Sequence, residues 1–453
     1  MLHARRSRVV RPSSEVTQIG SVCAPRGSFI VARMRTTHLL AGALFAVLPL
    51  ASVSGCSASP SDGETVAQGD QGILGHLCPE YIIYCPPDEV RTCRIENGCS
   101  YCTCSAPTPP APQTLATGNY PTGVATDGTN VYWLADTEWN LSDDTGSWIL
   151  STCPVSGCNG APKTLASGGG QQSENVAVDG SNVYWTAGSN LYSCAKTGCA
   201  APTLLHAGQS PAELALDASN IYWTDSGSLL KCAKTGCGSA PVTVGSSDGA
   251  ALAVDSSGVY WFQSKNLVTC PSTGCNGAPV TLATNVPEGS AFTIDATNVY
   301  WVVGTWTNYS DLGSVSGPSY VEACAKTGCT AAGPRTLVTT ADSDGYFTGI
   351  TVDASNVYWT AVTLTLVGSP ATDAAMTGSV KSCPIAGCTT PTTIWSEPIG
   401  TLNTVGLPPG PFNIVNESST LIWTNWQGAG GTIDFGTSNA TYPFGSVMTI
   451  STQ

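Results

Sequence analysis

Charge is scarce in this chain, and so are histidines and long apolar runs. Only 11% of the 453 residues are charged, and the net charge is −14. Of four histidines only His206 lies beyond residue 111, which excludes a histidine-rich metal site. The apolar run at 39–50 is too short to span a bilayer. A surface this acidic repels phosphates, so we expect no nucleic-acid partner. We also expect neither a metal nor a cofactor.

Glycine, proline and an internal repeat are abundant instead. The 49 glycines and 30 prolines are typical of a turn-rich, all-β protein. Nearly the same phrase recurs seven times, and a unit that small cannot bury its own apolar face. The copies must therefore pack on one another. The phrase lies at 124–136, 176–188, 214–226, 252–264, 292–304, 350–362 and, more loosely, 412–426.

Each repeat is predicted to form four short strands. In the second repeat, alternating apolar residues separated by turn residues place these strands at 174–179, 182–187, 190–194 and 201–207. Four-stranded antiparallel sheets that recur about every 40 residues are typical of β-propeller blades. The last repeat stops after a third strand, and residues 112–117 match a fourth. We therefore predict an all-β, seven-bladed propeller closed by an N-terminal strand and preceded by a small disulfide-rich module.

The repeated phrase resembles the YWTD repeat of propellers in the low-density-lipoprotein receptor family and its bacterial relatives. Residues 222–225 read Tyr-Trp-Thr-Asp, and 184–186 and 358–360 match up to the final Asp. The resemblance covers 114–451 as motif and spacing, and it implies a propeller. Those receptor propellers have six blades, whereas seven phrases are counted here, so the blade number is not taken from the resemblance.

Two residue types recur in the phrase, and both have a structural and a functional interpretation. The repeated Asp could be catalytic or bind calcium, but capping of the turn's N–H groups is favoured. The tryptophans are expected to fill the gaps between blades. These residues are Asp127, Asp179, Asp217, Asp255, Asp295, Asp353, and Trp133, Trp185, Trp223, Trp261, Trp301, Trp359, Trp423.

Six repeats also carry a C-x4-C unit. Zinc sites favour paired C-x2-C knuckles, whereas each pair here stands alone in its repeat, so a disulfide across a hairpin is favoured over metal binding. A loop this short contributes roughly 2 kcal/mol, so each bridge is expected to pin its hairpin rather than hold the fold together. The predicted pairs are Cys153/Cys158, Cys194/Cys199, Cys232/Cys237, Cys270/Cys275, Cys324/Cys329 and Cys383/Cys388.

The N-terminal region predicts export. Residues 34–56 have a basic start, a short apolar core and a Val-Ser-Gly-Cys ending, as a signal peptide does. The ending resembles the lipobox of bacterial lipoproteins, which implies lipidation of Cys56 and display at the outer membrane; ordinary cleavage near Ala58 is the alternative. Residues 1–33 are interpreted as a mis-assigned start without structure. Loss of 1–56 removes seven Arg and one Glu, which takes the net charge from −14 to −20.

Between the signal peptide and the propeller we predict a flexible tether at 57–77, a cysteine-rich module at 78–104 and a proline-rich linker at 105–111. Six cysteines in 78–104 indicate a disulfide-stapled segment, because so small a segment has no adequate core. The end of the module weakly resembles antistasin-type protease inhibitors; a spacer is favoured over inhibition. The propeller is then expected at 112–453.

Binding is predicted on one face of the propeller. Four blades carry insertions between their second and third strands, at 135–147, 303–319, 362–379 and 425–445. Loops on a rigid scaffold are where recognition concentrates, and exposed aromatics beside acids suit a protein or a sugar. Loops without a function are the alternative. The candidate binding residues are Trp139, Asp143, Asp144, Trp306, Tyr309, Asp311, Trp426 and Tyr442.

The sequence thus predicts a monomeric, lipid-anchored envelope protein that contacts the membrane only through its anchor and binds an envelope protein or glycan. The alternative is a hydrolase or lyase that uses carboxylates near the ring axis, because acid/base pairs leave no linear signature. Several acids at the axis would favour the enzyme, whereas aromatics on the rim would favour the binding protein.

Overall fold

A computed structural model describes residues 21–23, 29–32, 81–85, 90–96, 99–105, 111–140, 145–169, 172–238, 240–249, 251–287, 291–304, 318–340, 346–368, 371–401, 410–417, 419–426, 433–434, 439–440 and 445–452. The chain divides into two compact units, Met1–Pro109 and Pro110–Gln453. In the part of the chain so described, no helix is long and apolar enough to cross a membrane.

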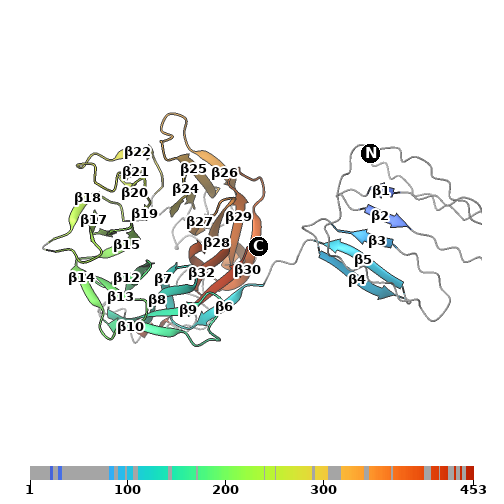
Figure 1. Ribbon diagram of the computed structural model, residues 1–453, viewed down its shortest axis with the longest axis horizontal. Coiled ribbons are helices and arrows are strands. Elements are labelled where there is room, and N and C mark those ends of the chain that lie inside the picture. Colours follow the sequence, from blue (N-terminus) through green and yellow to red (C-terminus); the bar gives the residue numbers. More distant parts are fainter. Residues whose placement is uncertain are drawn as a thin grey trace, which may run out of the picture. The chain divides into compact units, whose positions relative to one another are not determined.

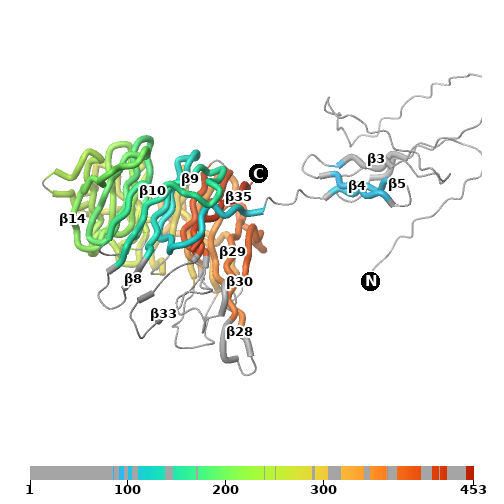
Figure 2. Tube along the Cα trace, turned by 90° about the horizontal axis from the view of Figure 1, so that it is seen from below, coloured from blue at the N-terminus to red at the C-terminus, as the bar shows by residue number. Residues whose placement is uncertain are grey.

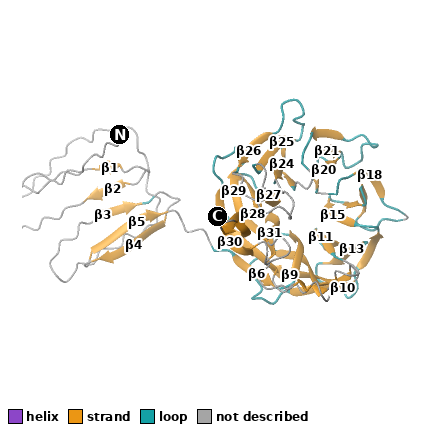
Figure 3. Ribbon diagram, turned by 180° about the vertical axis from the view of Figure 1, so that it is seen from behind, coloured by secondary structure: helices purple, strands orange, loops and turns teal. Residues whose placement is uncertain are grey.

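The second unit is a ring of seven four-stranded antiparallel sheets joined by turns and loops (Figures 1 and 3). In blades 1 to 6 the strands follow chain order outward from the innermost strand, and the innermost strands of neighbouring blades contact one another. Blades 1 to 3 consist of β7 (Tyr120–Thr126), β8 (Asn130–Asn140), β9 (Thr145–Pro154), β10 (Lys163–Gly169); β11 (Ser173–Val178), β12 (Asn182–Ala187), β13 (Asn190–Ala195), β14 (Thr203–Ala207); and β15 (Pro211–Leu216), β16 (Asn220–Asp225), β17 (Ser228–Ala233), β18 (Val242–Ser246).

The remaining blades repeat this arrangement, and the last one borrows its outer strand from the start of the unit. Blades 4 to 7 consist of β19 (Leu252–Val254), β20 (Val259–Gln263), β21 (Asn266–Cys270), β22 (Val280–Ala283); β23 (Phe292–Ile294), β24 (Asn298–Val303), β25 (Tyr320–Ala325), β26 (Arg335–Thr339); β27 (Tyr346–Val352), β28 (Asn356–Gly368), β29 (Ala371–Pro384), β30 (Thr392–Thr401); and β31 (Gly410–Glu417), β32 (Thr420–Trp426), β35 (Gly445–Ser451), β6 (Gln113–Thr117).

The ring closes between blades 7 and 1. The innermost strands contact one another in sequence, and β31 packs against β7. Strand β6 pairs antiparallel with β35, with Thr117 opposite Ser446 and Thr114 opposite Met448. The Leu115 side chain is buried in the core. The predicted seven blades and the closing N-terminal strand are therefore confirmed.

Tryptophan and tyrosine side chains fill the contacts between blades, as expected. Trp185 of blade 2 lies 5.7 Å from Trp148 of blade 1, edge to face, and stacks on Tyr192 at 5.5 Å between ring centroids. Such rings bury large apolar areas, which makes them a main source of inter-blade stability. The repeated tryptophans are at most 4% exposed: Trp133, Trp185, Trp223, Trp261, Trp301, Trp359 and Trp423.

The repeated Asp caps the turn between the first two strands of its blade. One carboxylate oxygen of Asp127 accepts hydrogen bonds from the backbone N–H groups of Thr129 and Asn130, and the other accepts one from the Tyr132 hydroxyl. Partial burial acts to raise the pKa of Asp127, but the ion pair with Lys196 and these hydrogen bonds lower it to about 2. The interpretation of this Asp as a turn cap is confirmed.

The Thr of the Tyr-Trp-Thr phrase joins neighbouring blades, which sequence reasoning did not anticipate. Thr186 is fully buried at an irregular point of the β11–β12 pairing. Its hydroxyl accepts a hydrogen bond from the Asn175 N–H (3.2 Å) and donates one to the Ala212 carbonyl of blade 3 (3.1 Å). Thr360 likewise donates to the Phe412 carbonyl of blade 7 (2.7 Å). The hydroxyl therefore satisfies backbone groups on both sides of a blade interface.

Replacement of this hydroxyl is a direct test of its role. We expect Thr186→Val to lower the free energy of unfolding by about 1–3 kcal/mol, because two partly buried backbone groups lose their partner. Thr186→Ser, which keeps the hydroxyl, is expected to be closer to the wild type. Chemical unfolding curves measure both variants, and equal stability of the Val variant and the wild type would contradict the assignment.

Disulfides close the six C-x4-C loops. Each joins cysteines five residues apart, and in each loop the Gly before the second cysteine has φ near +100° to +124°, a backbone conformation that favours glycine. The bonds are Cys153–Cys158, Cys194–Cys199, Cys232–Cys237, Cys270–Cys275, Cys324–Cys329 and Cys383–Cys388.

The first unit contains short strands and two further disulfides. Its strands are β1 (Ser21–Cys23), β2 (Phe29–Ala32), β3 (Tyr81–Tyr84), β4 (Val90–Glu96) and β5 (Cys99–Ser105). Cys85 bonds to Cys104, and Cys93 to Cys102. Strand β1 pairs with β2, and β2 pairs with β3, so that the Phe-Ile-Val-Ala segment lies beside Tyr-Ile-Ile-Tyr. The predicted signal peptide at 34–56, including Cys56, and the tether at 57–77 lie outside the described residues.

Candidate functional site

The two rims of the ring are built from different connections. On one rim, the cysteine loops bond to the Asp turns of their own blades, as in Lys196 N–H to Ser181 carbonyl (3.0 Å). On the other rim, the turns between the second and third strands bond to the links between blades, as in Gly208 N–H to Ser189 carbonyl (2.6 Å). The insertions belong to the second rim, which we call the insertion face.

Long hairpins extend from the insertion face. The β28–β29 pairing runs from Asn356 opposite Pro384 out to Gly368 opposite Ala371, whereas β16–β17 ends where Asp225 lies opposite Ser228. Figure 2 shows the ring from its edge, and β28 leaves the ring on one side. The face is therefore uneven, with tall hairpins on some blades and tight turns on others.

Two insertions from different blades join on this face. Within the insertion of blade 7, β33 (Ile433–Asp434) pairs with β34 (Asn439–Ala440). Strand β34 then pairs with β8 of blade 1, with Ala440 opposite Trp139 and Asn439 opposite Asn140. The described parts of the insertions at 135–147 and 425–445 thus join in one sheet across the closure of the ring.

Most of the predicted binding residues lie outside what the structure describes. Trp139 is in β8 and Trp426 in β32, where Trp426 pairs with Gly410 and Gly445, and only their backbones are described. The backbone places both on the insertion face, and the β8–β34 pairing includes Trp139 itself. The other predicted residues lie outside the described residues: Asp143, Asp144, Trp306, Tyr309, Asp311 and Tyr442.

A group of acids on and beside the innermost strands of blades 1 to 3 was missed by the sequence reasoning. Asp136, on β8, is only 2% exposed and accepts hydrogen bonds from the Ser173 N–H (2.9 Å) and hydroxyl (2.8 Å). Burial raises the pKa of Asp136 to about 6 against the lowering effect of these hydrogen bonds. Ser173 begins blade 2, so Asp136 also ties blade 1 to the next blade.

Two glutamates follow on the innermost strands of the next blades. Glu213, on β15, is half-buried, and its carboxylate accepts a hydrogen bond from the Asn175 amide on β11 (3.1 Å). Burial and the negative charge of Glu174 raise the pKa of Glu213 to about 8. The Glu174 side chain is exposed to solvent. Desolvation by the surrounding protein and the negative charge of Asp136 nevertheless raise the pKa of Glu174 as well.

These three carboxyl groups, which we call the axial acids, act on one another across blades 1, 2 and 3. The charge of Asp136 raises the pKa of Glu174, and the charge of Glu174 raises that of Glu213. A carboxyl group whose pKa is raised by burial and by a neighbouring negative charge keeps its proton to a higher pH than a free carboxyl group does. Such a group can donate or accept a proton, or bind a cationic group.

Because the pKa values of the axial acids are raised in the folded protein, we expect the free energy of unfolding to fall as the pH rises. An acid whose pKa is higher in the folded state stabilises the fold below its unfolded pKa, and this stability is lost as the pH passes the folded value. For Asp136 the window runs from about pH 4 to 6, with a loss of about 1–3 kcal/mol. For Glu213 the loss continues toward pH 8.

Unfolding curves from pH 5 to 8 measure this effect. The rim carboxylates Asp127 and Asp179, with pKa values of about 2, are ionised throughout that range and do not oppose it. Asp136→Asn is expected to flatten the lower part of the curve, and Glu213→Gln the upper part. A stability that rises with pH over this range would contradict the raised pKa values.

Another acid near the insertion face has a structural role. Asp225, the last residue of the Tyr-Trp-Thr-Asp phrase, is 7% exposed and accepts hydrogen bonds from the Gln209 and Ser210 N–H groups and the Ser226 hydroxyl. It fixes the link between blades 2 and 3.

A serine with G-x-S-x-G spacing at 245–249 also has a structural role. Ser247 is 7% exposed, and its hydroxyl accepts a hydrogen bond from the Gly249 N–H. A nucleophile elbow is followed by a helix, whereas this segment is followed by the strand β19. His206 lies in β14 with its ring 5.3 Å from that of Trp223. Among the described residues, no group of three or more His, Cys, Asp or Glu side chains is arranged to hold a metal ion.

Comparison with known proteins gives a distant likeness in fold. The sequence matches no protein-family model and no curated protein. Among solved structures it is similar to a chain of a nidogen/laminin complex (17% identity, TM-score 0.34, covering 52% of this chain and 85% of that one). It is also similar to BamB from Moraxella catarrhalis (13%, TM-score 0.35, 72% and 83%) and to the N-terminal domain of Nup159 (10%, TM-score 0.42, 74% and 90%). At these values the likeness carries no inference about function.

Proposed function

We propose that this protein is an exported, lipid-anchored propeller that binds an envelope protein or glycan through its insertion face. One observation carries the proposal: the insertions of blades 7 and 1 join through β34 and β8 into one sheet on that face. Loops without a function are not expected to form strands that pair with a loop far away in sequence. A shared sheet gives the face a defined backbone on which a partner can dock.

The cysteines and the charge of the chain support the setting of this proposal. The many disulfides indicate an extracytoplasmic protein, since such bonds persist in oxidising compartments. In the proposal Cys56 carries the lipid and the anchor is the only membrane contact. A net charge of −20 after residue 56 favours a neutral or basic partner over nucleic acid or an anionic lipid surface.

A pull-down from envelope extracts and a glycan array, both with a chain that starts at residue 57, test the proposal. Trimming the insertions at 135–147 and 425–445 to the turn length of blade 3 is expected to remove binding. The matched control changes the exposed Ser181, Ser219 and Ser257 of the opposite rim to Arg and is expected to retain it. Retention of every partner after trimming would refute the assigned face.

A second function is favoured by the axial acids. Glu213, with its pKa of about 8, holds a proton near neutral pH beside ionisable Glu174, as a general acid and its partner do in carboxylate hydrolases and lyases. Incubation of the protein with envelope glycans, followed by mass spectrometry of the products, tests this alternative. Turnover that is lost in Glu213→Gln without a loss of stability would support it, and absence of turnover leaves binding as the function.

A further inference from the structure

The cysteine loops contact the preceding blade as well as their own hairpin. In three interfaces a lysine of the loop pairs with the turn Asp of the blade before it: Lys196 with Asp127 (2.5 Å), Lys234 with Asp179 (2.9 Å), and Lys326 with Asp255. Each of these lysines also lies over the ring of a tyrosine of that preceding blade, at 5.0 to 5.9 Å from its centroid. These loops therefore contact the neighbouring blade in addition to closing their own hairpins.

Backbone groups also connect a cysteine loop to the preceding blade. They do so in the loop of blade 6, which has no lysine, and in the loop of blade 5, which has one. The Cys388 N–H donates to the Leu337 carbonyl of blade 5 (2.9 Å), and the Cys329 N–H donates to the Leu282 carbonyl of blade 4 (2.8 Å). Both acceptors lie at the irregular point of an outer strand, where the carbonyl is not used by its own sheet. The loop thus completes the hydrogen bonding of its neighbour.

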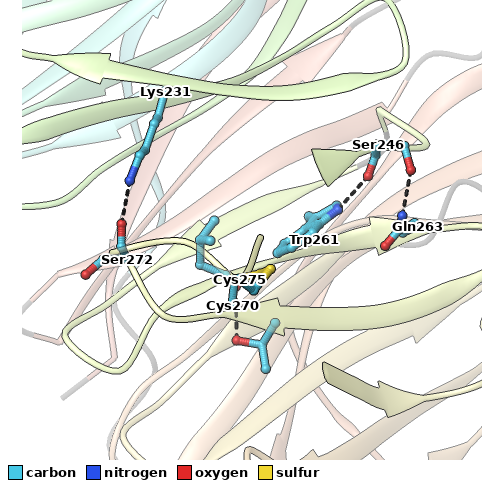
Figure 4. Close-up of a disulfide and its surroundings, with 9 residues drawn as sticks. Lys231, Ser246, Trp261, Gln263, Cys270, Ser272 and Cys275 are labelled. Atoms are coloured by element: carbon cyan, nitrogen blue, oxygen red, sulfur yellow. Dashed lines mark hydrogen bonds between the residues drawn. A yellow bond between two sulfur atoms is a disulfide. The ribbon is translucent and has the colours of Figure 1, made fainter. Parts of the chain in front are cut away.

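Basic side chains also reach forward from the preceding blade to the loop. Lys231 of blade 3 donates to the Ser272 carbonyl in the loop that Cys270–Cys275 closes (2.6 Å), as Figure 4 shows. Lys163 of blade 1 donates to the Thr197 carbonyl (2.7 Å), and Arg335 of blade 5 donates to the Ile385 carbonyl (2.8 Å). At the ring closure, Cys158 Sγ lies 3.5 Å from the Leu115 carbonyl of β6.

The interface between blades 6 and 7 has no such loop, because the sequence has no cysteine after Cys388. Ile394 occupies the position in β30 that Leu337 occupies in β26. The contacts across this interface include the Thr348 and Thr360 hydroxyls, which donate to the Pro411 (2.6 Å) and Phe412 (2.7 Å) carbonyls, and the amide of Asn416, which donates to the Val352 carbonyl (3.5 Å). The Asn425 amide donates to Glu397 (2.7 Å), and the Trp395 and Trp423 rings lie 5.5 Å apart. This interface has hydroxyl, amide and aromatic contacts but no disulfide loop.

We propose that the cysteine loops are an oxidation-dependent latch on six of the seven blade interfaces, and that the interface between blades 6 and 7 is the seam at which the ring opens first. Oxidation of each pair removes two electrons and two protons from two thiols; a disulfide oxidant such as oxidised glutathione accepts them and is released as two thiols. The closed loop holds its N–H and lysine groups in place against the neighbouring blade. The reduced loop loses that order, so the rigidity of the ring depends on the redox state of its compartment.

Hydrogen exchange read by mass spectrometry on the full chain tests the latch. Cys383→Ser with Cys388→Ser opens the loop of blade 6, and we expect exchange in β26 of the preceding blade to become about tenfold faster. Strand β22 of blade 4 is the internal control, because the loop of Cys324–Cys329 still covers it. A change confined to blade 6, with β26 as slow as in the wild type, would overturn the latch.

Two further hydrogen-exchange measurements complete the test. If the double variant does not fold, folded wild-type chain reduced with tris(2-carboxyethyl)phosphine replaces it, with the same expected change in β26. In the oxidised wild type at low urea, we expect the amides of β30 and β31 to exchange at least about tenfold faster than those of β26 and β27. Equal exchange rates in the two groups, or the reverse order, would overturn the seam.

Discussion

Replacement of residues 113–117 by a Gly-Ser repeat of equal length is expected to lower the free energy of unfolding by about 5 kcal/mol or more. This replacement removes the outer strand of blade 7, the hydrogen bonds to β35 and the buried Leu115 side chain. A buried Leu alone contributes about 2–5 kcal/mol, and each ladder hydrogen bond adds about 1 kcal/mol. The loss approaches the whole stability of a typical protein, so the ring is expected to open.

Chemical unfolding curves followed by tryptophan fluorescence measure this loss. Single substitutions at the exposed Gln113 and Thr117 to Ala serve as controls and are expected to change stability by less than about 0.5 kcal/mol. A chain that keeps wild-type stability after the replacement would show that β6 does not close the ring.

Trp359→Ala is expected to lower the free energy of unfolding by about 3–5 kcal/mol. Trp359 is fully buried between blades 5 and 6, where it packs with Tyr300, Leu337 and Phe347. Removal of so large a side chain leaves a cavity that its rigid neighbours cannot fill. Urea unfolding gives the loss, and a change below about 1 kcal/mol would contradict the packing role of the repeated tryptophans.

A pair of Phe variants separates packing from hydrogen bonding. The indole N–H of Trp359 has no acceptor among the described residues, whereas that of Trp301 donates to Glu322 (3.0 Å). Both variants remove part of the buried ring. Trp359→Phe additionally removes a donor that has no partner, whereas Trp301→Phe breaks the hydrogen bond to Glu322. We expect Trp301→Phe to be the more destabilising, and to raise the already elevated pKa of Glu322 further. The reverse order would contradict the assigned hydrogen bond.

The fold could be predicted because each blade repeats the same local signals. The alternation of Val183, Tyr184 and Trp185, with Asp179 and Asn182 at the turn, specifies a hairpin without reference to the rest of the chain. The unpaired third strand at 445–450 and the spare segment at 112–117 then implied closure, which the β35–β6 pairing confirms. Local patterns and a count of strands were sufficient for this part.

The polar contacts between blades, unlike the packing of the tryptophans, could not be predicted, because they depend on which loops become neighbours in the ring. Lys326 and Asp255 are 71 residues apart, and no linear pattern marks them as an ion pair. Glu174 and Glu213 look like ordinary polar residues at the start of two strands, and only the ring brings their charges together. The pairing of β34 with β8 likewise depends on the closure that places blade 7 beside blade 1.

Binding of a closing-strand peptide in trans shows whether β6 closes the ring, since a propeller that lacks its closing strand must accept that strand when it is supplied as a peptide. The test uses the full chain with 113–117 replaced and a synthetic peptide of residues 111–118. We predict that this peptide binds and restores stability, whereas a scrambled peptide of the same composition does neither. If the replaced chain is as stable as the wild type and ignores the peptide, the closed seven-bladed ring, and the insertion face that depends on it, would be contradicted.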